Sequence, residues 1–237
     1  NINKLAINKY AGDVLVEKPI FHEMIGIPDN EFKNIFVGYN LRFHPLLIKL
    51  KEILKNQKIL STNVYVGQYL PDWRPEQDHK ISYSASINQG GGVLKDLSHE
   101  FDYIFWILGG WKCLASIGGR VGNLTVDSED IYSIIMETKL CPVLTVQMSY
   151  FDRQKQRKII INTADNHVEA DLIKGSLKIN GIEEIIECHA DKTYLDMHDA
   201  YLNRELDQLC SYTNALEVME LIAKIEIANK HIWIRNE

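Results

Sequence analysis

The stretch from Gly90 to Gly110 joins a glycine-rich turn to side chains that can exchange protons. Asp96 and His99 are three residues apart, a spacing that places a carboxylate and an imidazole on one face of a helix. Asp96 is a favoured N-cap residue type, and Gly109 is a stop signal. An imidazole, with an unperturbed pKa of about 6.5, changes charge near neutral pH. The stretch therefore predicts a helix that starts at Asp96 and carries a proton-transfer site in its first turn.

Each polar side chain of this helix also has a structural interpretation. Asp96 could act only as the cap, and His99 could be a histidine with satisfied hydrogen bonds near a helix start. Asp102 could be a structural partner on the same face. The opposite stripe is apolar at helical spacing and predicts a core-facing side, formed by Leu97, Phe101, Ile104 and Leu108.

A lysine follows an apolar segment near the start of the chain. Residues 13–17 have the composition of a buried strand, and Lys18 comes next, directly before Pro19. The proline holds Lys18 extended at the carboxyl end of the strand, the edge at which open α/β sheets bind ligands. The ammonium group could reach a substrate hydroxyl there, although a solvated surface lysine is the alternative.

Further candidate residues follow a second strand and occupy a long loop. Arg42 could contact a ligand, or it could tie two parts of the fold together. The loop of residues 71–86 carries Trp73, Arg74 and Tyr83, and long polar loops with aromatic residues often have functional roles. Packing within the fold or against a second subunit is the alternative for these aromatic residues.

The order of predicted elements indicates an α/β fold. Apolar strands at residues 13–17 and 35–39, with a helix to about residue 56, predict a parallel, βαβ-like opening. Later segments alternate and are joined by short turns, which predicts one large, mainly antiparallel sheet. Its strands are expected at about 60–70, 112–121, 130–138, 142–151, 157–163, 167–173 and 176–187. Leu202, Leu206 and Leu209 predict one helical stripe, and Val218, Leu221, Ile225 and Ala228 predict the next.

Composition limits the class of protein. The chain has 237 residues, is 46% hydrophobic and carries a net charge of −6, which predicts one large or two smaller globular domains without a nucleic-acid or acidic-membrane partner. The basic run of residues 153–158 is interpreted as a solvated turn. Neither a membrane span nor a secretory signal is recognisable, so we expect a cytoplasmic protein. The four cysteines are widely scattered, which indicates free thiols and no metal site. The first residue is Asn1, so we expect that residues precede it in the natural protein.

Several motifs together resemble one family of enzymes. Glu17-Lys18-Pro19, the segment Val37 to Pro45, the segment Gly90 to Gly110 and a final helix at residues 215–230 occur in the order known for that family. It is the glucose-fructose oxidoreductase, inositol dehydrogenase and rhizopine-catabolism (Gfo/Idh/MocA) family of nicotinamide-dependent sugar dehydrogenases. One difference is the spacing of Asp96, which is three residues before His99, whereas family members commonly have four.

The resemblance implies an α/β architecture with a remnant of a Rossmann parallel sheet and an α+β domain with a large, mainly antiparallel open sheet. Residues 1–45 would be the C-terminal part of the dinucleotide-binding domain, 46–214 the substrate and oligomerisation domain, and 215–237 a closing helix packed back on the Rossmann part. The Gly-x-Gly-x-x-Gly phosphate loop would belong to roughly 80 to 90 residues upstream of this sequence. The cofactor would be NAD or NADP, without a basis for choosing between them.

The resemblance also implies hydride transfer between the nicotinamide and a secondary hydroxyl of a sugar, sugar derivative or nucleotide sugar. His99 would be the base, Lys18 its electrostatic and hydrogen-bonding partner, and Asp96 an orienting group. Cofactor contacts would come from Glu17, Lys18 and Pro19, and substrate contacts from Arg42, Trp73, Arg74 and Tyr83. The open sheet would form a homo-oligomer, a dimer or a tetramer. A non-catalytic binding or assembly protein and a nicotinamide-assisted sugar dehydratase or hydrolase are the alternatives.

Overall fold

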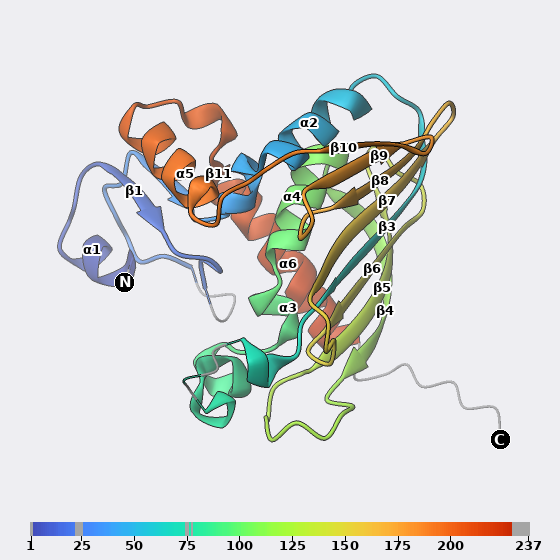
Figure 1. Cartoon of the computed structure of the whole chain (residues 1–237). Helices are drawn as coiled ribbons and strands as arrows, with labels where there is room; N and C mark the ends of the chain where they lie inside the picture. Colours follow the sequence, from blue (N-terminus) through green and yellow to red (C-terminus); the bar gives the residue numbers. More distant parts are fainter. Residues whose placement is uncertain (1, 22–25, 74–75, 77, 229–237) are drawn as a thin grey trace.

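The protein contains a small sheet and a large sheet with helices packed between them (Figure 1). The computed structural model describes residues 2–21, 26–73, 76 and 78–228. The helices α2 (Pro45–Leu54), α4 (His99–Leu108) and α6 (Tyr212–Ala228) lie on one side of the large sheet, and in the described part of the chain no helix covers its other side (Figure 1). The α/β architecture with a large open sheet, expected from the sequence, is confirmed.

The small sheet has the strand order β1-β2-β11. Strands β1 (Asp13–Val16) and β2 (Asn34–Val37) are parallel, as predicted, and helix α1 (Ile2–Ile7) precedes them. Strand β11 (Cys210–Ser211) pairs antiparallel with β2. The prediction of a helical stripe from Leu202 to Leu209 is wrong, because helix α5 (Lys192–Leu202) ends there and the chain turns through η6 (Leu206–Gln208) to form this strand.

The large sheet has eight strands in the order β10-β9-β8-β7-β3-β6-β5-β4, and β3 with β6 is its parallel pair. Its strands are β3 (Ile59–Gly67), β4 (Trp111–Gly119), β5 (Ile131–Thr138), β6 (Leu144–Ser149), β7 (Gln156–Thr163), β8 (His167–Asp171), β9 (Ser176–Ile179) and β10 (Ile182–Ile185). The single strand predicted over 176–187 is a hairpin instead. Asn180 and Gly181 both have positive φ, which suits a tight hairpin turn.

Two residues, His44 and Pro45, determine where helix α2 (Pro45–Leu54) begins. Pro45 occupies the first turn, and His44 is the N-cap, whose Nδ1 accepts a hydrogen bond from the Leu46 amide at 3.2 Å. A protonated imidazole has no acceptor nitrogen. Burial, together with the nearby charge of Arg157, lowers the pKa of His44 to about 4, so the imidazole stays neutral and the cap persists at neutral pH.

The helix predicted to begin at Asp96 is divided into two. Asp96 is the last residue of α3 (Val93–Asp96), and α4 (His99–Leu108) begins after Ser98. Asp96 is therefore not the N-cap of the longer helix, and its carboxylate bonds a tyrosine instead of a backbone amide. The predicted stop is confirmed, since Gly109 follows α4 with a φ of 75°.

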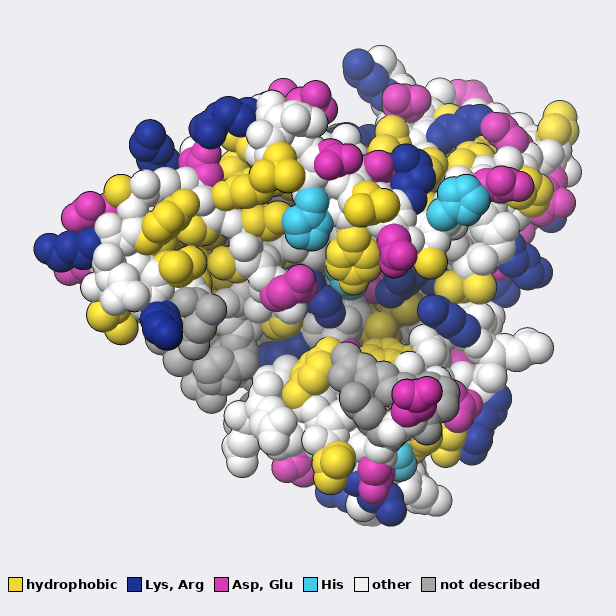
Figure 2. Space-filling model, turned by 60° about the vertical axis from the view of Figure 1, so that its left-hand side comes forward, with side chains coloured by type: hydrophobic (Ala, Val, Ile, Leu, Met, Phe, Trp, Pro, Cys, Tyr) yellow, Lys and Arg dark blue, Asp and Glu magenta, His cyan; other side chains and the backbone are white. Residues whose placement is uncertain are grey.

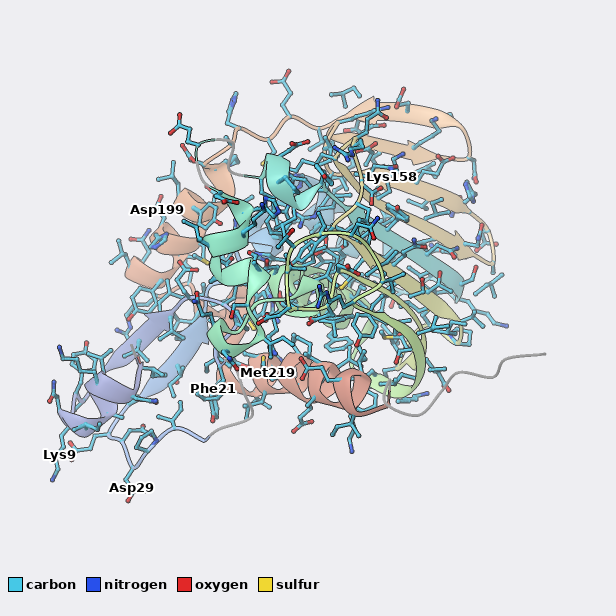
Figure 3. The ribbon with its side chains drawn as sticks, turned by 90° about the horizontal axis from the view of Figure 1, so that it is seen from below. Lys9, Phe21, Asp29, Lys158, Asp199 and Met219 are labelled. Carbon is cyan, nitrogen blue, oxygen red and sulfur yellow. The ribbon has the colours of Figure 1, made fainter. Side chains whose placement is uncertain are left out.

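The core lies between the inner face of the large sheet and the helices. On β5 the alternation is clear, since Tyr132, Ile134 and Met136 are buried and Ile135 is 57% exposed on the outer face. Helix α6 (Tyr212–Ala228) packs against β2, β4, β11 and α4, and so contacts both sheets. Figure 3 shows Phe21 beside this helix, and its ring centroid is 6.5 Å from that of Tyr212.

Helix α5 and strand β11 belong spatially to the small sheet. The helix packs on η1 (Asn40–Phe43), directly after β2, and β11 pairs with β2 itself. Both lie before residue 214, where the sequence placed the end of the substrate domain. The chain thus returns to the small sheet before residue 214. None of the described helices is both long and apolar enough to span a bilayer.

Candidate active site

Lys18 and Asp96 are brought into contact although 78 residues separate them in the chain. Lys18 follows β1, and its Nζ donates a hydrogen bond of 2.7 Å to the backbone carbonyl oxygen of Asp96. Burial lowers the pKa of Lys18, while the negative charges of Asp96 and Glu100 oppose that shift. A lysine with a lowered pKa gives up its proton more readily, so Lys18 is suited to proton sharing as well as to charge stabilisation.

The carboxylate of Asp96 is held by a residue from the large sheet. The hydroxyl of Tyr150 donates a hydrogen bond of 2.7 Å to Asp96 Oδ2. Tyr150 is fully buried, and Trp73 packs edge-on against its ring at a centroid distance of 5.4 Å. Asp96 is thus fixed at its backbone by Lys18 and at its side chain by Tyr150. Sequence reasoning did not identify Tyr150, because nothing in its neighbourhood marks it as a partner of Asp96.

His99 is buried at the start of α4, beside this pair. The Tyr39 ring stands edge-on to the imidazole at 5.5 Å, and the Tyr39 hydroxyl bonds Ser98 Oγ at 3.3 Å. Burial, and then the positive charges of Lys18 and Arg157, hold the pKa of His99 well below its usual value. Its Nδ1 is buried, with no hydrogen-bond partner among the described residues. The imidazole is therefore neutral at pH 7.

A buried ion pair adjoins the histidine. Glu100 is completely buried, and its Oε1 lies 2.7 Å from Nε of Arg157 on β7. Burial raises the pKa of Glu100, and the Arg157 charge opposes this rise. Arg157 belongs to the basic run that the sequence predicted to be a solvated turn. That interpretation is wrong for Arg157, because its guanidinium reaches inward to a buried carboxylate.

The glycine turn runs against the long loop. A Cβ at Gly91 would collide with the backbone carbonyl of Tyr83, so only glycine allows the two segments to approach this closely. Tyr83 and Gly90 line a cavity of about 600 Å³ together with Glu17, Lys18 and Pro19. Figure 2 shows this side of the molecule hollowed between its main body and a lower lobe. The lobe contains the short helical turns η2 (Leu70–Asp72), η3 (His79–Ile81), η4 (Tyr83–Ala85) and η5 (Ile87–Gln89).

This cavity fits part of a dinucleotide site. It adjoins the carboxyl end of β1 in a parallel strand pair, the edge at which open α/β sheets bind ligands. Glu17, Lys18 and Pro19, the residues predicted to contact the cofactor, all line it. They would form one wall of a nicotinamide site.

Arg42 occupies a structural position. Its guanidinium bonds Asp102 through Nε and Nη2, with the shortest distance at 2.7 Å, and Nη1 bonds the Leu209 carbonyl at 3.3 Å. Both members of the ion pair are buried. All three guanidinium nitrogens donate hydrogen bonds within the protein. We therefore interpret Arg42 as a structural residue that connects elements of the fold, which was the alternative to a substrate contact. Asp102 is its partner.

The three predicted loop residues have different surroundings. Tyr83 is 41% exposed and lines the cavity beside Lys18. Trp73 is half-buried against Tyr150, and its Nε1 is buried with no partner in the described part of the chain. Arg74 lies outside the described residues.

Comparisons with known proteins agree with the fold. No family model matches the chain. It is 24% identical over 228 residues to an uncharacterized oxidoreductase of Streptococcus pneumoniae, covering 90% of this chain and 62% of that protein. The chain therefore spans less than two thirds of the length of this curated relative.

Similar solved structures include oxidoreductases and dehydrogenases. An oxidoreductase from Thermotoga maritima has a TM-score of 0.73 at 16% identity, covering 92% of this chain and 69% of that one. Levoglucosan dehydrogenase with NADH and L-sorbose has a TM-score of 0.73 at 14% identity, over 92% and 71% of the two chains. The WlbA dehydrogenase from Bordetella pertussis with NADH and UDP-GlcNAcA has a TM-score of 0.71 at 15% identity, over 92% and 70%. The chain has the fold that the sequence resemblance implied.

Proposed function

We propose that the chain is part of an NAD- or NADP-dependent oxidoreductase that transfers a hydride between the nicotinamide and a secondary hydroxyl of a sugar, sugar derivative or nucleotide sugar. The observation that supports the proposal is that Lys18, which lines a cavity at the carboxyl end of β1, bonds the carbonyl of Asp96, three residues before His99. Similar structures hold NADH with L-sorbose or with UDP-GlcNAcA, which supports a sugar-like substrate.

The residues divide the chemistry between them. When bound, a nicotinamide supplies the hydride acceptor. We assign His99 as the base that accepts the hydroxyl proton as the substrate carbonyl forms, because a neutral imidazole has a nitrogen that can accept a proton. Lys18 stabilises the developing negative charge on the oxygen, and Asp96 fixes the position of the lysine through its carbonyl.

The first prediction concerns Lys18 and His99. Replacing either by alanine removes a proton-handling group, so we expect turnover to fall about 100-fold or more. The measurement is nicotinamide absorbance with a panel of sugars, using the protein expressed from its complete gene. The control is Lys158→Ala, because Lys158 is exposed on the large sheet (Figure 3) and should leave the rate unchanged. Full activity in Lys18→Ala removes that residue from the mechanism, and absence of turnover despite cofactor binding argues against the whole proposal.

We also propose a cytoplasmic, bacterial enzyme that works as a homo-oligomer through the outer face of the large sheet. Cys141, Cys188 and Cys210 are free thiols, which suits a reducing compartment. The outer face exposes Ile117, Ile135 and Ile160, and apolar side chains on an uncovered sheet suit contact with a second subunit.

A further inference from the structure

The segment of residues 127–130 lies directly before β5 and is bonded to the lobe beside the cavity. The hydroxyl of Ser128, a fully buried residue, donates a hydrogen bond of 2.7 Å to the Ser84 carbonyl. Ser84 follows Tyr83 in the chain, and Tyr83 lines the cavity. The segment therefore helps to hold the part of the lobe that forms one wall of the cavity.

The same segment is bonded to two elements that position Asp96. The Val93 amide, at the start of α3, donates a hydrogen bond of 3.0 Å to the Glu129 carbonyl. The Tyr150 amide donates one of 2.9 Å to the Asp130 carbonyl. Helix α3 ends at Asp96, and the Tyr150 hydroxyl bonds the Asp96 carboxylate. The helix that carries Asp96 and the tyrosine that holds its side chain are thus attached to one segment.

The carboxylate of Glu129 lies against the glycine turn. Its Oε1 accepts a hydrogen bond of 3.4 Å from the Leu94 amide, in the first turn of α3. A Cβ at Gly92 would collide with this carboxylate, and Gly92 has a φ of 115°, which side chains other than that of glycine rarely allow. Glycine at position 92 therefore leaves the space that the carboxylate occupies.

Charged groups of two helices face Glu129. Lys95 of α3 is buried and pairs with Glu226 of α6 at 2.8 Å. Burial raises the pKa of Glu129 to about 7, and the Glu226 charge adds to the rise, whereas the Lys95 charge and the Leu94 amide oppose it. Burial also raises the pKa of Tyr150 well above its usual value, so its hydroxyl stays protonated. Glu129 is thus the group in this cluster that gains or loses a proton near neutral pH.

The two aspartates of the segment bind other backbone amides. Asp127 Oδ1 accepts a hydrogen bond of 2.7 Å from the Ile87 amide. The Asp130 carboxylate accepts hydrogen bonds from the amides of Val121 and Gly122, at 2.8 and 3.0 Å. These carboxylates hold the loops around the segment, whereas the carboxylate of Glu129 contacts the start of α3.

We infer that Glu129 is a positioning residue of the active site, whose carboxylate holds the start of α3 and thereby the Asp96 carbonyl to which Lys18 bonds. The inference rests on the proposed oxidoreductase function and adds to it a residue from another element. An ionised carboxylate accepts a stronger hydrogen bond from the Leu94 amide than a neutral acid does. Protonation of Glu129 therefore loosens the start of α3 and displaces the group that orients Lys18.

The second prediction is a pH dependence of turnover. With the protein expressed from its complete gene, kcat should fall about fivefold as the pH decreases through about 7, because a charge-assisted hydrogen bond becomes a neutral one. Glu129→Gln has nearly the same size without the charge, so it should show the lower kcat at about pH 8 and lack the step, with KM nearly unchanged. His99 titrates at lower pH, since its pKa lies well below its usual value. Nicotinamide absorbance between about pH 5.5 and pH 8.5 measures both constants.

Two further variants test whether the charge at this position is responsible. Glu129→Asp keeps a carboxylate and should keep a step in kcat near neutral pH. Glu52→Gln is the matched control, because Glu52 is exposed on α2 and the same substitution there should leave kcat and its step unchanged. Loss of the step in Glu129→Asp, or an equal effect of Glu52→Gln, contradicts the inference.

Hydrogen–deuterium exchange provides a readout that does not depend on turnover. Peptides covering residues 92–97 should exchange about fivefold faster in Glu129→Gln than in the natural protein or in Glu52→Gln, all at about pH 8. Unchanged exchange, a step in kcat that persists in Glu129→Gln, or faster exchange with the natural kcat overturns the inference while leaving the oxidoreductase proposal intact. Absence of turnover of every sugar by the natural protein, with NADH bound, overturns the proposed function and the inference with it.

Discussion

Asp96 shows how much of a residue's role depends on its partners. From the sequence it was a helix cap and a companion of His99 on one helix face. In the structure a break at Leu97 and Ser98 separates the two residues, so helical periodicity does not relate their side chains. Two residues distant in sequence hold Asp96 in place instead. Lys18 donates a hydrogen bond to its backbone carbonyl, and Tyr150 donates one to its carboxylate. The three-residue spacing between Asp96 and His99 thus spans the break between α3 and α4.

The third prediction concerns Tyr150, a positioning residue. Tyr150→Phe keeps the ring that packs on Trp73 and removes the hydroxyl that holds Asp96. Lys18 also bonds Asp96, so a displaced Asp96 should misplace Lys18. We therefore expect kcat to fall about tenfold, equal to about 1.4 kcal/mol of transition-state stabilisation, with KM nearly unchanged. Steady-state kinetics measure the split between kcat and KM. A variant that raises KM alone, or changes neither constant, contradicts this role.

At the scale of elements, one buried ion pair joins four segments. Arg42 in η1 bonds Asp102 in α4, the Leu209 carbonyl before β11 and the Asn214 side chain in α6. Two of these segments adjoin strands of the small sheet, and the other two are helices that lie on the large sheet. A buried charge is costly when its partner is removed, so the pair fixes how the segments are arranged more than it adds net stability.

The fourth prediction follows from this pair. Arg42→Ala leaves Asp102 buried and uncompensated, and we expect the free energy of unfolding to fall by about 3–5 kcal/mol. Urea denaturation followed by circular dichroism measures it. Lys112→Ala is the control, because the Lys112–Glu137 pair is exposed and its loss should cost less than about 1 kcal/mol. A similar free energy of unfolding for the two variants would show that the Arg42–Asp102 pair does not hold these segments together.

At the scale of the whole molecule, the large sheet is covered on one face only. The helices and the small sheet occupy its inner side (Figure 1), and the site residues come from both parts. Lys18 follows β1 of the small sheet, whereas Tyr150 directly follows β6 and Arg157 lies on β7 of the large sheet. The candidate site therefore depends on how the two sheets are joined, and the uncovered face remains available for a second subunit.

The fifth prediction tests the proposed oligomer. Ile135 is 57% exposed on the outer face of β5, next to the edge strand β4, so Ile135→Glu should place charges in the interface and shift the protein toward monomers. Sedimentation velocity of the protein from its complete gene reports the change. Leu202→Glu is the control, since Leu202 is 72% exposed at the end of α5, away from that face. A natural protein that is already monomeric contradicts the oligomer.

The sequence by itself determined the elements that have strong local patterns. The parallel pair β1 and β2, strands β3 to β8 of the large sheet and the end of α4 at Gly109 all follow from apolar periodicity and turn residues, which act over a few positions. Lys18, Asp96 and His99 were also recognisable as candidates, because their residue types and neighbours suit proton transfer.

Only the tertiary structure decided which of these residues meet and what surrounds them. Strand β11 has two residues and no periodicity of its own, so its pairing with β2 depends on distant parts of the chain. Tyr150 and Glu100 have no local pattern that identifies them, and their roles come from contacts with Asp96 and Arg157 across 54 and 57 positions. Burial, which sets the pKa of Lys18 and His99, is likewise a property of the assembled fold.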